Sequence, residues 1–219
     1  ASQSGGRIIK LDHENILLSV GDYRNRYLAQ DFDNINGKII KINILNKDYE
    51  IISLGHRNPQ GLYLDLDRKF ILETEHGPQG GDEINLIELD KINNKEKLNY
   101  GWPVVSAGEH YGKDSLIRKK KYKKYPLYKS HTEYGFIEPL KSFVPSIGIS
   151  EVIKIKENHY LVGSMRDKAL YFFNINNKKK ITNLEKVDVF ERVRDLKIFK
   201  NKVYFFLEDT PSIGIMSMN

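Results

Sequence analysis

The sequence of 219 residues contains no cysteine. It therefore offers no disulfide framework, no thiolate metal site and no thiol nucleophile. Cytosolic proteins and disulfide-free periplasmic proteins share this absence, so it does not choose between the two compartments. Apolar runs long enough to span a membrane are also missing, and no signal peptide opens the chain. The first residues, ASQSGGRII, are consistent with a processed or truncated product.

Charge of one sign is in excess. The formal net charge is +6, and RKKKYKKYP (118–126) places six basic residues among the seven positions from Arg118 to Lys124. Binding to nucleic acid or to an anionic surface is one interpretation of such a run. The other is a solvated excursion, and the abundance of lysine elsewhere in the chain favours it. We therefore expect neither a nucleic-acid partner nor a membrane span.

One pattern recurs four times along the chain. Each copy consists of a strand-like run, a polar turn and a second run, at residues 5–22, 60–77, 148–165 and 193–210, and a further apolar run follows each, at 37–45, 82–89, 168–175 and 213–218. The runs are short, β-branched and aromatic, and bounded by Gly, Asn and Asp, which is typical of strands. Their repetition predicts an all-β fold, a β-propeller of four-stranded antiparallel blades. A β-sandwich would explain the alternation but not the repetition.

The repeats also set the expected domain organisation. We expect one partial propeller domain over residues 1–219, with blades near 5–45, 50–90, 142–176 and 186–218 and an irregular basic excursion at about 91–141. An open arc of four blades would expose strand edges, which pair readily with other chains. The expected outcome is a homo-oligomer that covers the open edges, or closure of the arc into a smaller ring.

The loop in TEHGPQGGDEINLI (74–87) is too polar for core packing, since it combines acidic residues, a histidine, three glycines and a proline. The glycines allow unusual backbone dihedrals, and the proline removes a hydrogen-bond donor. Carbonyls turned outward beside carboxylates are the ligands that calcium takes. An ordinary hairpin loop with a solvated acidic end is the alternative.

Loops that follow the second run of each repeat converge in a propeller. They hold Asp22–Arg26, His76–Asp82, Ser164–Lys168 and Glu208–Thr210, and the segments 54–61 and 190–196 lead into the blades beside them. Four arginines occur in these segments: Arg57, Arg166, Arg192 and Arg194. Because guanidinium pairs bidentately with carboxylate, such a group suits a planar polyanionic ligand. The alternative is that each arginine is an ordinary surface charge.

Several longer motifs carry a family resemblance. They are SLGHRNPQGL (53–62), TEHGPQGGDEINLI (74–87), NYGWPVV (99–105), EPLKSFVPSIGIS (138–150) and RVRDLKIF (192–199) with VYFFLED (203–209). Together they resemble the soluble quinoprotein glucose and aldose-sugar dehydrogenases, the glucose/sorbosone dehydrogenase family, in family order from residue 5 to about 210. That family has a six-bladed propeller, so the resemblance implies that this chain corresponds to the C-terminal two-thirds of such a protein.

The resemblance implies a cofactor, pyrroloquinoline quinone (PQQ), lying over the propeller axis with a calcium ion. The backbone carbonyls of Gly77 and Pro78 would hold that ion, which would act as a Lewis acid on the quinone carbonyl. Glu83 and Tyr100 match positions that hold a second, structural calcium in some members.

Further site residues follow from the same resemblance. Arg57 and Asn58 would face the quinone and the substrate, and His76 and Asp82 would lie on the cofactor side of the loop. Arg192 and Arg194 would clamp the carboxylates of the cofactor. Arg166 stands where the family usually has a lysine, so a planar fork replaces a point charge there.

The catalytic base of the family is replaced in this chain. Family members carry a histidine four residues before the arginine of GGR, where it takes the proton of the sugar hydroxyl, and here that position is Gln3. An amide cannot act as a general base near neutral pH, and a positioned base contributes about a hundred- to ten-thousand-fold in rate. His13 lies in a blade turn, away from the expected site.

Three functions remain open from the sequence. The first is a PQQ- and calcium-dependent aldose-sugar dehydrogenase that oxidises the C1 hydroxyl to a lactone, catalytically impaired in this form, with a small-molecule sugar and an unspecified electron acceptor as its partners. The second is a non-catalytic propeller that binds a sugar or another small ligand. The third is a fragment without independent activity. The resemblance also implies a periplasmic or secreted location.

Overall fold

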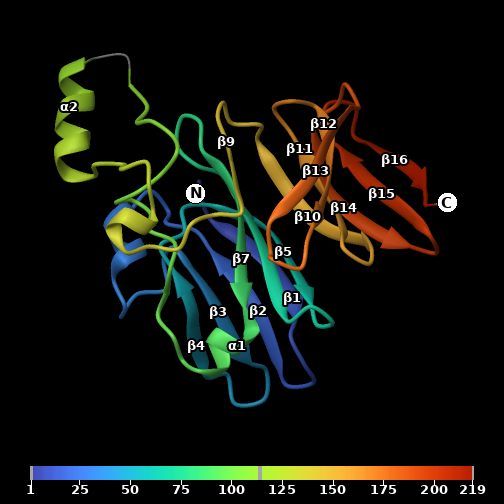
Figure 1. Ribbon diagram of the computed structural model, residues 1–219, viewed down its shortest axis with the longest axis horizontal. Coiled ribbons are helices and arrows are strands. Elements are labelled where there is room, and N and C mark those ends of the chain that lie inside the picture. Colours follow the sequence, from blue (N-terminus) through green and yellow to red (C-terminus); the bar gives the residue numbers. More distant parts are fainter. Residues whose placement is uncertain (1, 113–114, 219) are drawn as a thin grey trace. The chain divides into compact units, whose positions relative to one another are not determined.

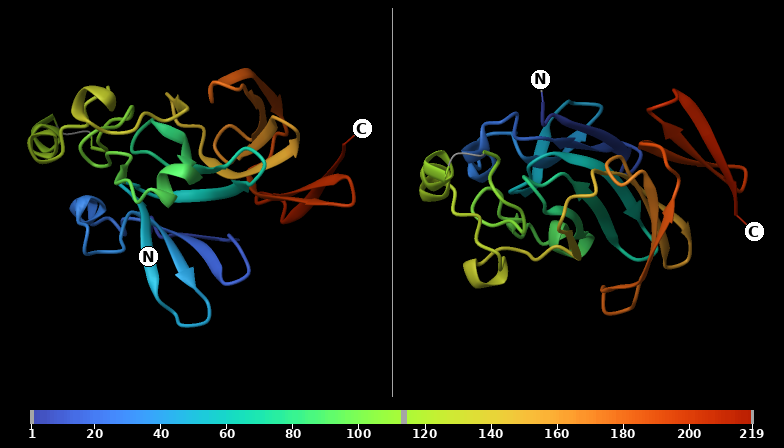
Figure 2. Two further views of the ribbon diagram at one scale, coloured as in Figure 1. Left: turned by 60° about the horizontal axis from the view of Figure 1, so that its bottom comes forward. Right: turned by 90° about the horizontal axis from the view of Figure 1, so that it is seen from above.

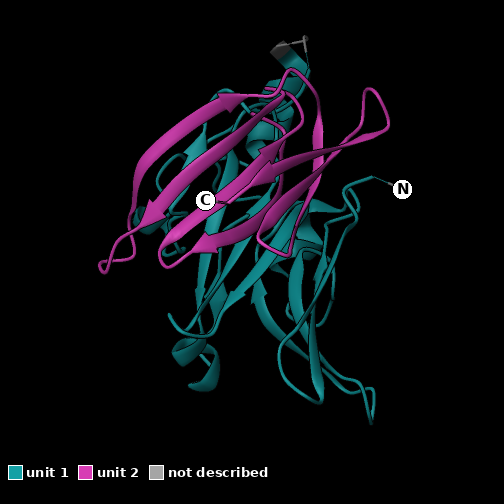
Figure 3. Ribbon diagram, turned by 90° about the vertical axis from the view of Figure 1, so that its right-hand side faces the viewer, with its two compact units in different colours: residues 1–146 teal, residues 147–219 magenta. Residues whose placement is uncertain are grey.

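The computed structural model describes residues 2–112 and 115–218. The chain divides into two compact units, residues 1–146 and 147–219 (Figure 3). Within the described ranges no helix is long and apolar enough to cross a membrane.

Unit 1 is built from two sheets (Figure 1). The first has the order β1 (Gly5–Lys10), β2 (Asn15–Val20), β3 (Lys38–Asn43), β4 (Tyr49–Leu54) and β8 (Leu98–Asn99). The second has the order β5 (Pro59–Asp65), β6 (Phe70–Glu75), β7 (Asp82–Glu88) and β9 (Lys141–Phe143). Neighbouring strands pair antiparallel, except for β4 and β8, which pair parallel.

Unit 2 contains the other two sheets, both antiparallel (Figure 2). One has the order β10 (Ile149–Lys156), β11 (His159–Ser164), β12 (Ala169–Ile175) and β13 (Ile181–Asp188). The other has the order β14 (Val193–Phe199), β15 (Lys202–Leu207) and β16 (Ser212–Ser217). The described residues thus form four sheets from four sequence repeats, and the all-β prediction is confirmed.

The predicted boundary between the first two blades is wrong. The second blade was expected to begin near residue 50, but β4 pairs with β3 in the first sheet. The turn before β4 explains this pairing, because Asn43 Oδ1 accepts hydrogen bonds from the backbone N–H groups of Leu45 and Asn46. Such a side-chain-capped turn folds the chain back on the strand it has just left. The second sheet therefore begins with β5.

The basic run lies on a helix within the excursion predicted at about 91–141. Helix α2 (Ser115–Lys124) contains no glycine or proline, and lysine and arginine are good helix formers. Arg118 Nη2 donates to Gln79 Oε1 at 3.1 Å, which ties the helix to the loop before β7. The remaining helical segments are short: α1 (Leu89–Asn93), η1 (Arg26–Gln30) and η2 (Thr132–Tyr134).

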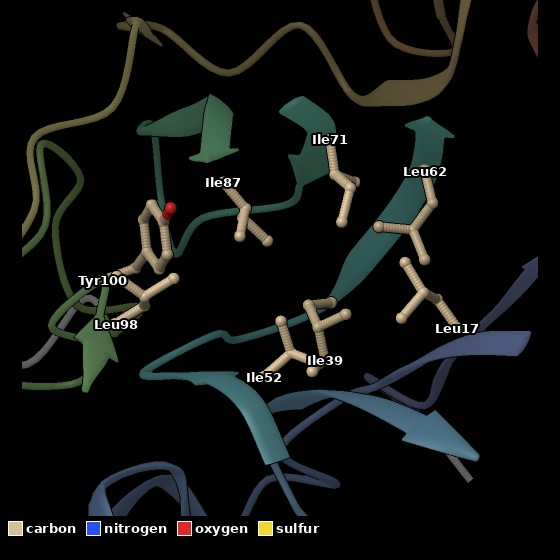
Figure 4. Close-up of a cluster of buried hydrophobic side chains, with 8 residues drawn as sticks. All are labelled: Leu17, Ile39, Ile52, Leu62, Ile71, Ile87, Leu98 and Tyr100. Carbon is tan, nitrogen blue, oxygen red and sulfur yellow. The ribbon is translucent and has the colours of Figure 1, made fainter. Parts of the chain in front are cut away.

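A buried apolar cluster joins the two sheets of unit 1 (Figure 4). Side chains of the first sheet face those of the second, and the cluster contains Leu17, Ile39, Ile52, Leu62, Ile71, Ile87, Leu98 and Tyr100. Burial of apolar surface is the main favourable term in folding, so this cluster holds the two sheets face to face.

The same face of the second sheet changes from apolar to acidic along the strands. The directly opposed residues of β6 and β7 are Ile71 with Ile87, then Glu73 with Asn85, then Glu75 with Glu83. Side chains alternate along a strand, so residues 71, 73 and 75 point to one face. The strands therefore carry three carboxylates into the contact between the sheets of unit 1.

Candidate functional site

A cavity of about 520 Å³ opens in unit 1 beyond the ends of the strands. Its lining consists of Gln3, Arg24, Arg26, Arg57 and Tyr111. Ligand sites for small molecules usually have about 300–1,000 Å³, and three guanidinium groups give this one a strong preference for anions. The segment Asp22–Arg26 and Arg57 thus meet in unit 1, as the repeat pattern predicts.

Backbone hydrogen bonds assemble this cavity from distant segments. The N–H of Tyr23 donates to the Gln3 carbonyl at 3.0 Å, and the N–H of Asp22 donates to the Arg57 carbonyl at 2.8 Å. Tyr23 and Arg24 both have positive φ angles, 50° and 66°, which turn the chain sharply after β2. This turn places Arg24 at the wall of the cavity.

Asp22 lies buried against residues that line the cavity. Its carboxylate is buried and accepts hydrogen bonds from the backbone N–H of Arg24 and from the indole Nε1 of Trp102, both at 2.8 Å. Burial raises the pKa of Asp22, although these hydrogen bonds and the neighbouring Arg57 oppose that rise. With its amide turned to satisfy both neighbours, Gln3 donates to Asp22 Oδ1 at 2.6 Å and accepts from Arg57 Nη2 at 2.7 Å.

Arg57 is the central cation of the site. It is 5% exposed, and its Nη1 donates to the carbonyl of His76 at 2.8 Å and also to the carbonyl of Gly77. Its guanidinium lies 5.4 Å from the ring centre of Trp102. Burial lowers the pKa of Arg57, but an arginine stays protonated in proteins, so the charge is retained.

Arg26 is held beside it by a neutral histidine. The guanidinium of Arg26 lies 5.1 Å from the centre of the Trp102 ring and contacts His110 Nδ1 at 2.8 Å. His110 Nε2 lies 2.7 Å from the Tyr125 carbonyl, so Nε2 carries the proton and Nδ1 accepts from Arg26. Burial lowers the pKa of His110, which agrees with a neutral ring.

The loop between β6 and β7 contacts Arg57 and has little steric freedom. A Cβ on Gly77 would lie 1.9 Å from the Gly81 carbonyl oxygen, and Gly80 and Gly81 have φ angles of +84° and +72°. Asp82 closes the loop, since its Oδ1 accepts from the Gly77 N–H at 3.2 Å and from Ser146 Oγ at 2.7 Å. The sequence-based argument from unusual dihedrals is therefore correct for Gly80 and Gly81, whereas Gly77 is required for close approach to the Gly81 carbonyl.

The calcium ligands expected at Gly77 and Pro78 fit this structure only in part. The Gly77 carbonyl accepts a hydrogen bond from Arg57, so an ion there would have to displace the guanidinium. Glu83 and Tyr100, the ligands expected for a second calcium, fit an ion better. They line one small cavity of about 10 Å³ together with Glu75 and Gly77. That volume is about the space taken by one water molecule or ion.

Carboxylates are concentrated beneath Arg57. Glu73 is fully buried, and Glu75 and Glu83 are 3% and 6% exposed. Burial raises the pKa of Glu73 and of Glu83 well above the usual range, and repulsion from Glu75 raises both further. These acids therefore need protons or a cation to be stable inside the protein.

The other predicted residues lie in different places. Asn58 Oδ1 accepts from Gln60 Nε2 at 3.1 Å and from the Gly5 N–H at 3.3 Å, so it braces the start of β1. His76 is half-buried at the start of the loop, and His13 is exposed in the turn between β1 and β2, as expected.

Three predicted cofactor arginines belong to unit 2. Arg192 Nε and Arg194 Nη2 both donate to Glu208 Oε2, at 3.2 and 2.7 Å. Arg166 is exposed in the turn between β11 and β12. Their meeting with Arg57 around one ligand stays a prediction.

Sequence reasoning missed Trp102 and Tyr111 as parts of the site. Trp102 is the single tryptophan of the chain and lies within NYGWPVV, so composition alone could have marked it. Tyr111 stands beside the basic run, and no local pattern distinguishes it from the other twelve tyrosines.

The class of protein is set by these features together with the comparisons. Four sheets of mainly antiparallel strands, one for each sequence repeat, are typical of a β-propeller, and unit 1 contains an arginine-lined cavity. The profile of the Glucose / Sorbosone dehydrogenase family matches residues 1–216. This chain belongs to that family.

Individual relatives agree. The aldose sugar dehydrogenase of Escherichia coli is 26% identical over 237 residues, covering 98% of this chain and 59% of that protein. Quinoprotein glucose dehydrogenase B of Acinetobacter calcoaceticus is 32% identical over 135 residues, which cover 48% of this chain and 26% of that protein.

A solved structure titled glucose dehydrogenase has a TM-score of 0.78 and 26% identity, and the match covers 98% of this chain and 64% of that one. The PQQ-bound aldose sugar dehydrogenase of Streptomyces coelicolor has a TM-score of 0.68 at 20% identity, with 95% and 57% of the two chains covered, and supports the fold. The propeller prediction is confirmed, and the chain spans about three-fifths of these structures.

Proposed function

We propose that this chain forms part of a PQQ- and calcium-dependent aldose sugar dehydrogenase that oxidises the C1 hydroxyl of a sugar to a lactone, and that its catalysis is impaired. One observation carries the proposal: Arg24, Arg26 and Arg57 line a cavity of about 520 Å³ in a member of this family. A planar ligand with several carboxylates satisfies three guanidinium groups at once.

The residues present fit PQQ. When bound, this group would supply the hydride acceptor. Arg24, Arg26 and Arg57 would hold its carboxylates, and Trp102 would keep Arg26 and Arg57 in place through its ring. Asn58, His76 and Asp82 would shape the nearby wall, and Arg166, Arg192 and Arg194 are proposed to complete the clamp from unit 2.

Calcium is a weaker part of the proposal. Calcium at the Gly77 and Pro78 carbonyls would compete with Arg57 for Gly77, whereas the small cavity beside Glu83 and Tyr100 offers room for one ion. We therefore assign no proton or electron step to calcium, and propose it only as a bound ion.

The contacts of Gln3 support the proposal that catalysis is impaired. Its amide bridges Asp22 and Arg57 at the position of the family base, and an amide does not take up a proton near neutral pH. The hydrogen bonds that the Asp22 oxygens accept from Gln3, from the Arg24 N–H and from Trp102 disfavour Asp22 as a substitute base. A histidine at position 3 would lie within reach of the Asp22 carboxylate, which would orient its ring as carboxylates orient catalytic histidines elsewhere.

The test is a PQQ titration followed by absorbance, then dye reduction with glucose and other aldoses. We expect saturable PQQ binding that Arg57→Lys weakens at least tenfold, because the buried fork loses contacts. Arg68→Lys is the matched control, because Arg68 lies in the turn between β5 and β6, at the other end of β6 from the loop that Arg57 contacts. This variant should bind PQQ normally. Binding unaffected by Arg57→Lys would disprove the assignment of the cavity.

The measurement of aldose oxidation tests the role of Gln3. The unmodified chain should oxidise aldoses feebly at most, and Gln3→His should raise the rate by about tenfold or more if PQQ binds. Robust turnover by the unmodified chain would show that another residue is the base.

A non-catalytic sugar-binding propeller is the second candidate. The closed Asp22–Gln3–Arg57 network favours it, since it holds the site together without a base. Equilibrium dialysis with labelled aldoses in the absence of PQQ tests it, and binding without turnover in the Gln3→His variant would favour it. We also propose, from the family, a periplasmic or secreted location, an external electron acceptor and self-association through exposed strand edges.

A further inference from the structure

A second group of ligand-type side chains lies deeper in unit 1 than the arginine-lined cavity. His56, Glu73 and Glu75 each offer one donor atom, and these three atoms lie within 4.8 Å of one another. His56 and Glu73 are fully buried, and Glu75 is 3% exposed. None of the roles proposed above uses His56 or Glu73.

The spacing of the donor atoms suits a small metal ion. His56 Nδ1 lies 3.2 Å from Glu75 Oε1 and 3.8 Å from Glu73 Oε2. Nitrogen and oxygen ligands about 2.1 Å from a tetrahedral ion lie roughly 3.4 Å apart. An ion therefore fits among these atoms with small side-chain adjustments.

Neighbouring groups already orient the three side chains. His56 Nε2 contacts Ser53 Oγ at 2.8 Å, which leaves Nδ1 facing the carboxylates. Asn85 Nδ2 donates to Glu73 Oε2 at 2.9 Å and to Glu75 Oε1 at 3.2 Å. Metal-binding histidines and carboxylates usually have such partners, which fix ring tautomer and ligand direction.

Two buried acceptors beside the group have no hydrogen-bond partner among the described residues. They are Glu73 Oε1 and Asn85 Oδ1, and both side chains are fully buried. Water bound to a metal ion would donate to acceptors of this kind. Among the described residues, Glu73 and Glu75 form ion pairs with His56 alone, so two buried carboxylates share one ion-pair partner.

We propose that His56, Glu73 and Glu75 bind one divalent transition-metal ion, of the Mn²⁺ or Zn²⁺ class. Imidazole with carboxylates is a ligand set for such ions, whereas calcium takes oxygen ligands alone. None of these three ligands is among the residues to which the resemblance assigns calcium, Gly77, Pro78, Glu83 and Tyr100, although Glu75 also lines the small cavity beside Glu83 and Tyr100.

The ion would have a structural role close to the arginine-lined cavity. His56 stands between β4 of the first sheet and β5 of the second, and Glu73 and Glu75 belong to β6, so the ion would link the two sheets of unit 1. Glu75 Oε2 accepts from the backbone N–H of Arg57. Binding of the ion would therefore fix the backbone that carries Arg57.

The experiment uses the full chain after chelation and dialysis. Mn²⁺ is added and followed by electron paramagnetic resonance, with Zn²⁺ as a competitor. We expect one tightly bound Mn²⁺ per chain with nitrogen hyperfine coupling from one imidazole, and displacement by Zn²⁺. Glu73→Gln should weaken binding at least tenfold, His56→Gln should abolish the nitrogen coupling, and Ser53→Ala should weaken binding by roughly 10–100-fold.

Glu151→Gln is the matched control, because it removes a buried carboxylate of β10 in unit 2 that belongs to neither proposed ion site. It should retain the bound Mn²⁺ and its nitrogen coupling. Circular dichroism of each variant checks that it is folded. Absence of bound Mn²⁺ in the unmodified chain, unchanged binding in Glu73→Gln, or loss of binding in Glu151→Gln alone would overturn the proposal. The outcome does not depend on PQQ binding or on sugar oxidation.

Discussion

Strands β6 and β16 distribute polarity in opposite ways. All six residues of β6 are buried, including Glu73 and Glu75. In β16 the apolar residues Ile213 and Ile215 are 55% and 57% exposed. Charge thus lies inside one sheet while aliphatic side chains lie on the surface of another.

The difference shows that the neighbouring sheet, and not the residue type, decides burial in these blades. Strand β6 has strands on both sides and the first sheet of unit 1 across its face. Strand β16 pairs with β15 alone within the described residues. Buried positions are usually occupied by hydrophobic residues, but a hydrophobic residue need not be buried. Where no second sheet covers a strand, as at β16 within the described residues, its isoleucines stay exposed.

The largest change in unfolding free energy is expected at a buried cation, which contrasts with the buried acids of β6. Lys38 of β3 is fully buried, and its Nζ donates to the carbonyls of Leu28, Ala29 and Asn36 at 2.8, 3.2 and 2.7 Å. Lys38→Met should lower the free energy of unfolding by about 3–4 kcal/mol, because buried carbonyls lose their donor. Urea denaturation measures it, with Lys41→Met as the partly exposed control; equal losses would contradict the prediction.

The Lys38 effect should also depend on pH. Burial lowers the pKa of Lys38 from 10.5 to about 8. Between these values the unfolded chain binds more protons, so the contribution of Lys38 to stability is greatest above pH 10.5 and falls as the pH drops to about 8. The stability difference between the unmodified chain and Lys38→Met should therefore widen from pH 8 to 10, and a constant difference would refute it.

The second prediction compares matched isoleucines. Ile71 of β6 is fully buried, and Ile215 of β16 is 57% exposed. Ile71→Ala should cost about 3 kcal/mol of unfolding free energy through a cavity, and Ile215→Ala should change it by less than about 0.5 kcal/mol. Urea denaturation followed by circular dichroism measures both. A similar cost for the two would mean that a further surface covers β16 in solution.

A smaller effect is expected at Glu73. Because burial and the neighbouring Glu75 raise the pKa of Glu73, its contribution to stability is present below the unfolded value of 4.5 and is lost as the pH rises. In the presence of chelator, Glu73→Gln should therefore stabilise the protein by roughly 1–2 kcal/mol at pH 8 but not at pH 4. Thermal denaturation at both pH values measures this, and equal shifts would contradict it.

The smallest effect is expected at the surface of unit 2. Glu208 pairs with Arg192 and Arg194, and all three side chains are 37–47% exposed. Glu208→Gln should change the unfolding free energy by less than about 0.5 kcal/mol, because exposed ion pairs contribute little. Urea denaturation at low and high salt measures this, and a loss above 1 kcal/mol would show that the pair is buried in solution.

The strand content could be predicted from the sequence because short alternating runs and their turns are local signals. The boundary at β4 could not, since it depends on the pairing of β4 with β3. Helix α2 was missed because its sequence has no apolar period, although its lysines favour a helix.

The candidate site was predictable only in its pieces. Arg57, Asp22–Arg26 and the glycine loop were marked by motif and by repeat position. The bridge from Gln3 to Asp22 and Arg57 joins residues far apart in the chain, and no local pattern encodes it. The alternation in FILETE (70–75) predicts a strand with one solvent-exposed face. Glu73 is buried because the other sheet of unit 1 covers that face.

Trp102 gives the protein a built-in optical reporter. It is the single tryptophan, its indole nitrogen donates to Asp22, and two guanidinium groups lie over its ring. Its emission therefore comes from one known place, directly behind the arginine-lined cavity. Any ligand that moves Arg26 or Arg57, or that absorbs near-ultraviolet light beside them, changes that emission, so occupancy can be read without a label.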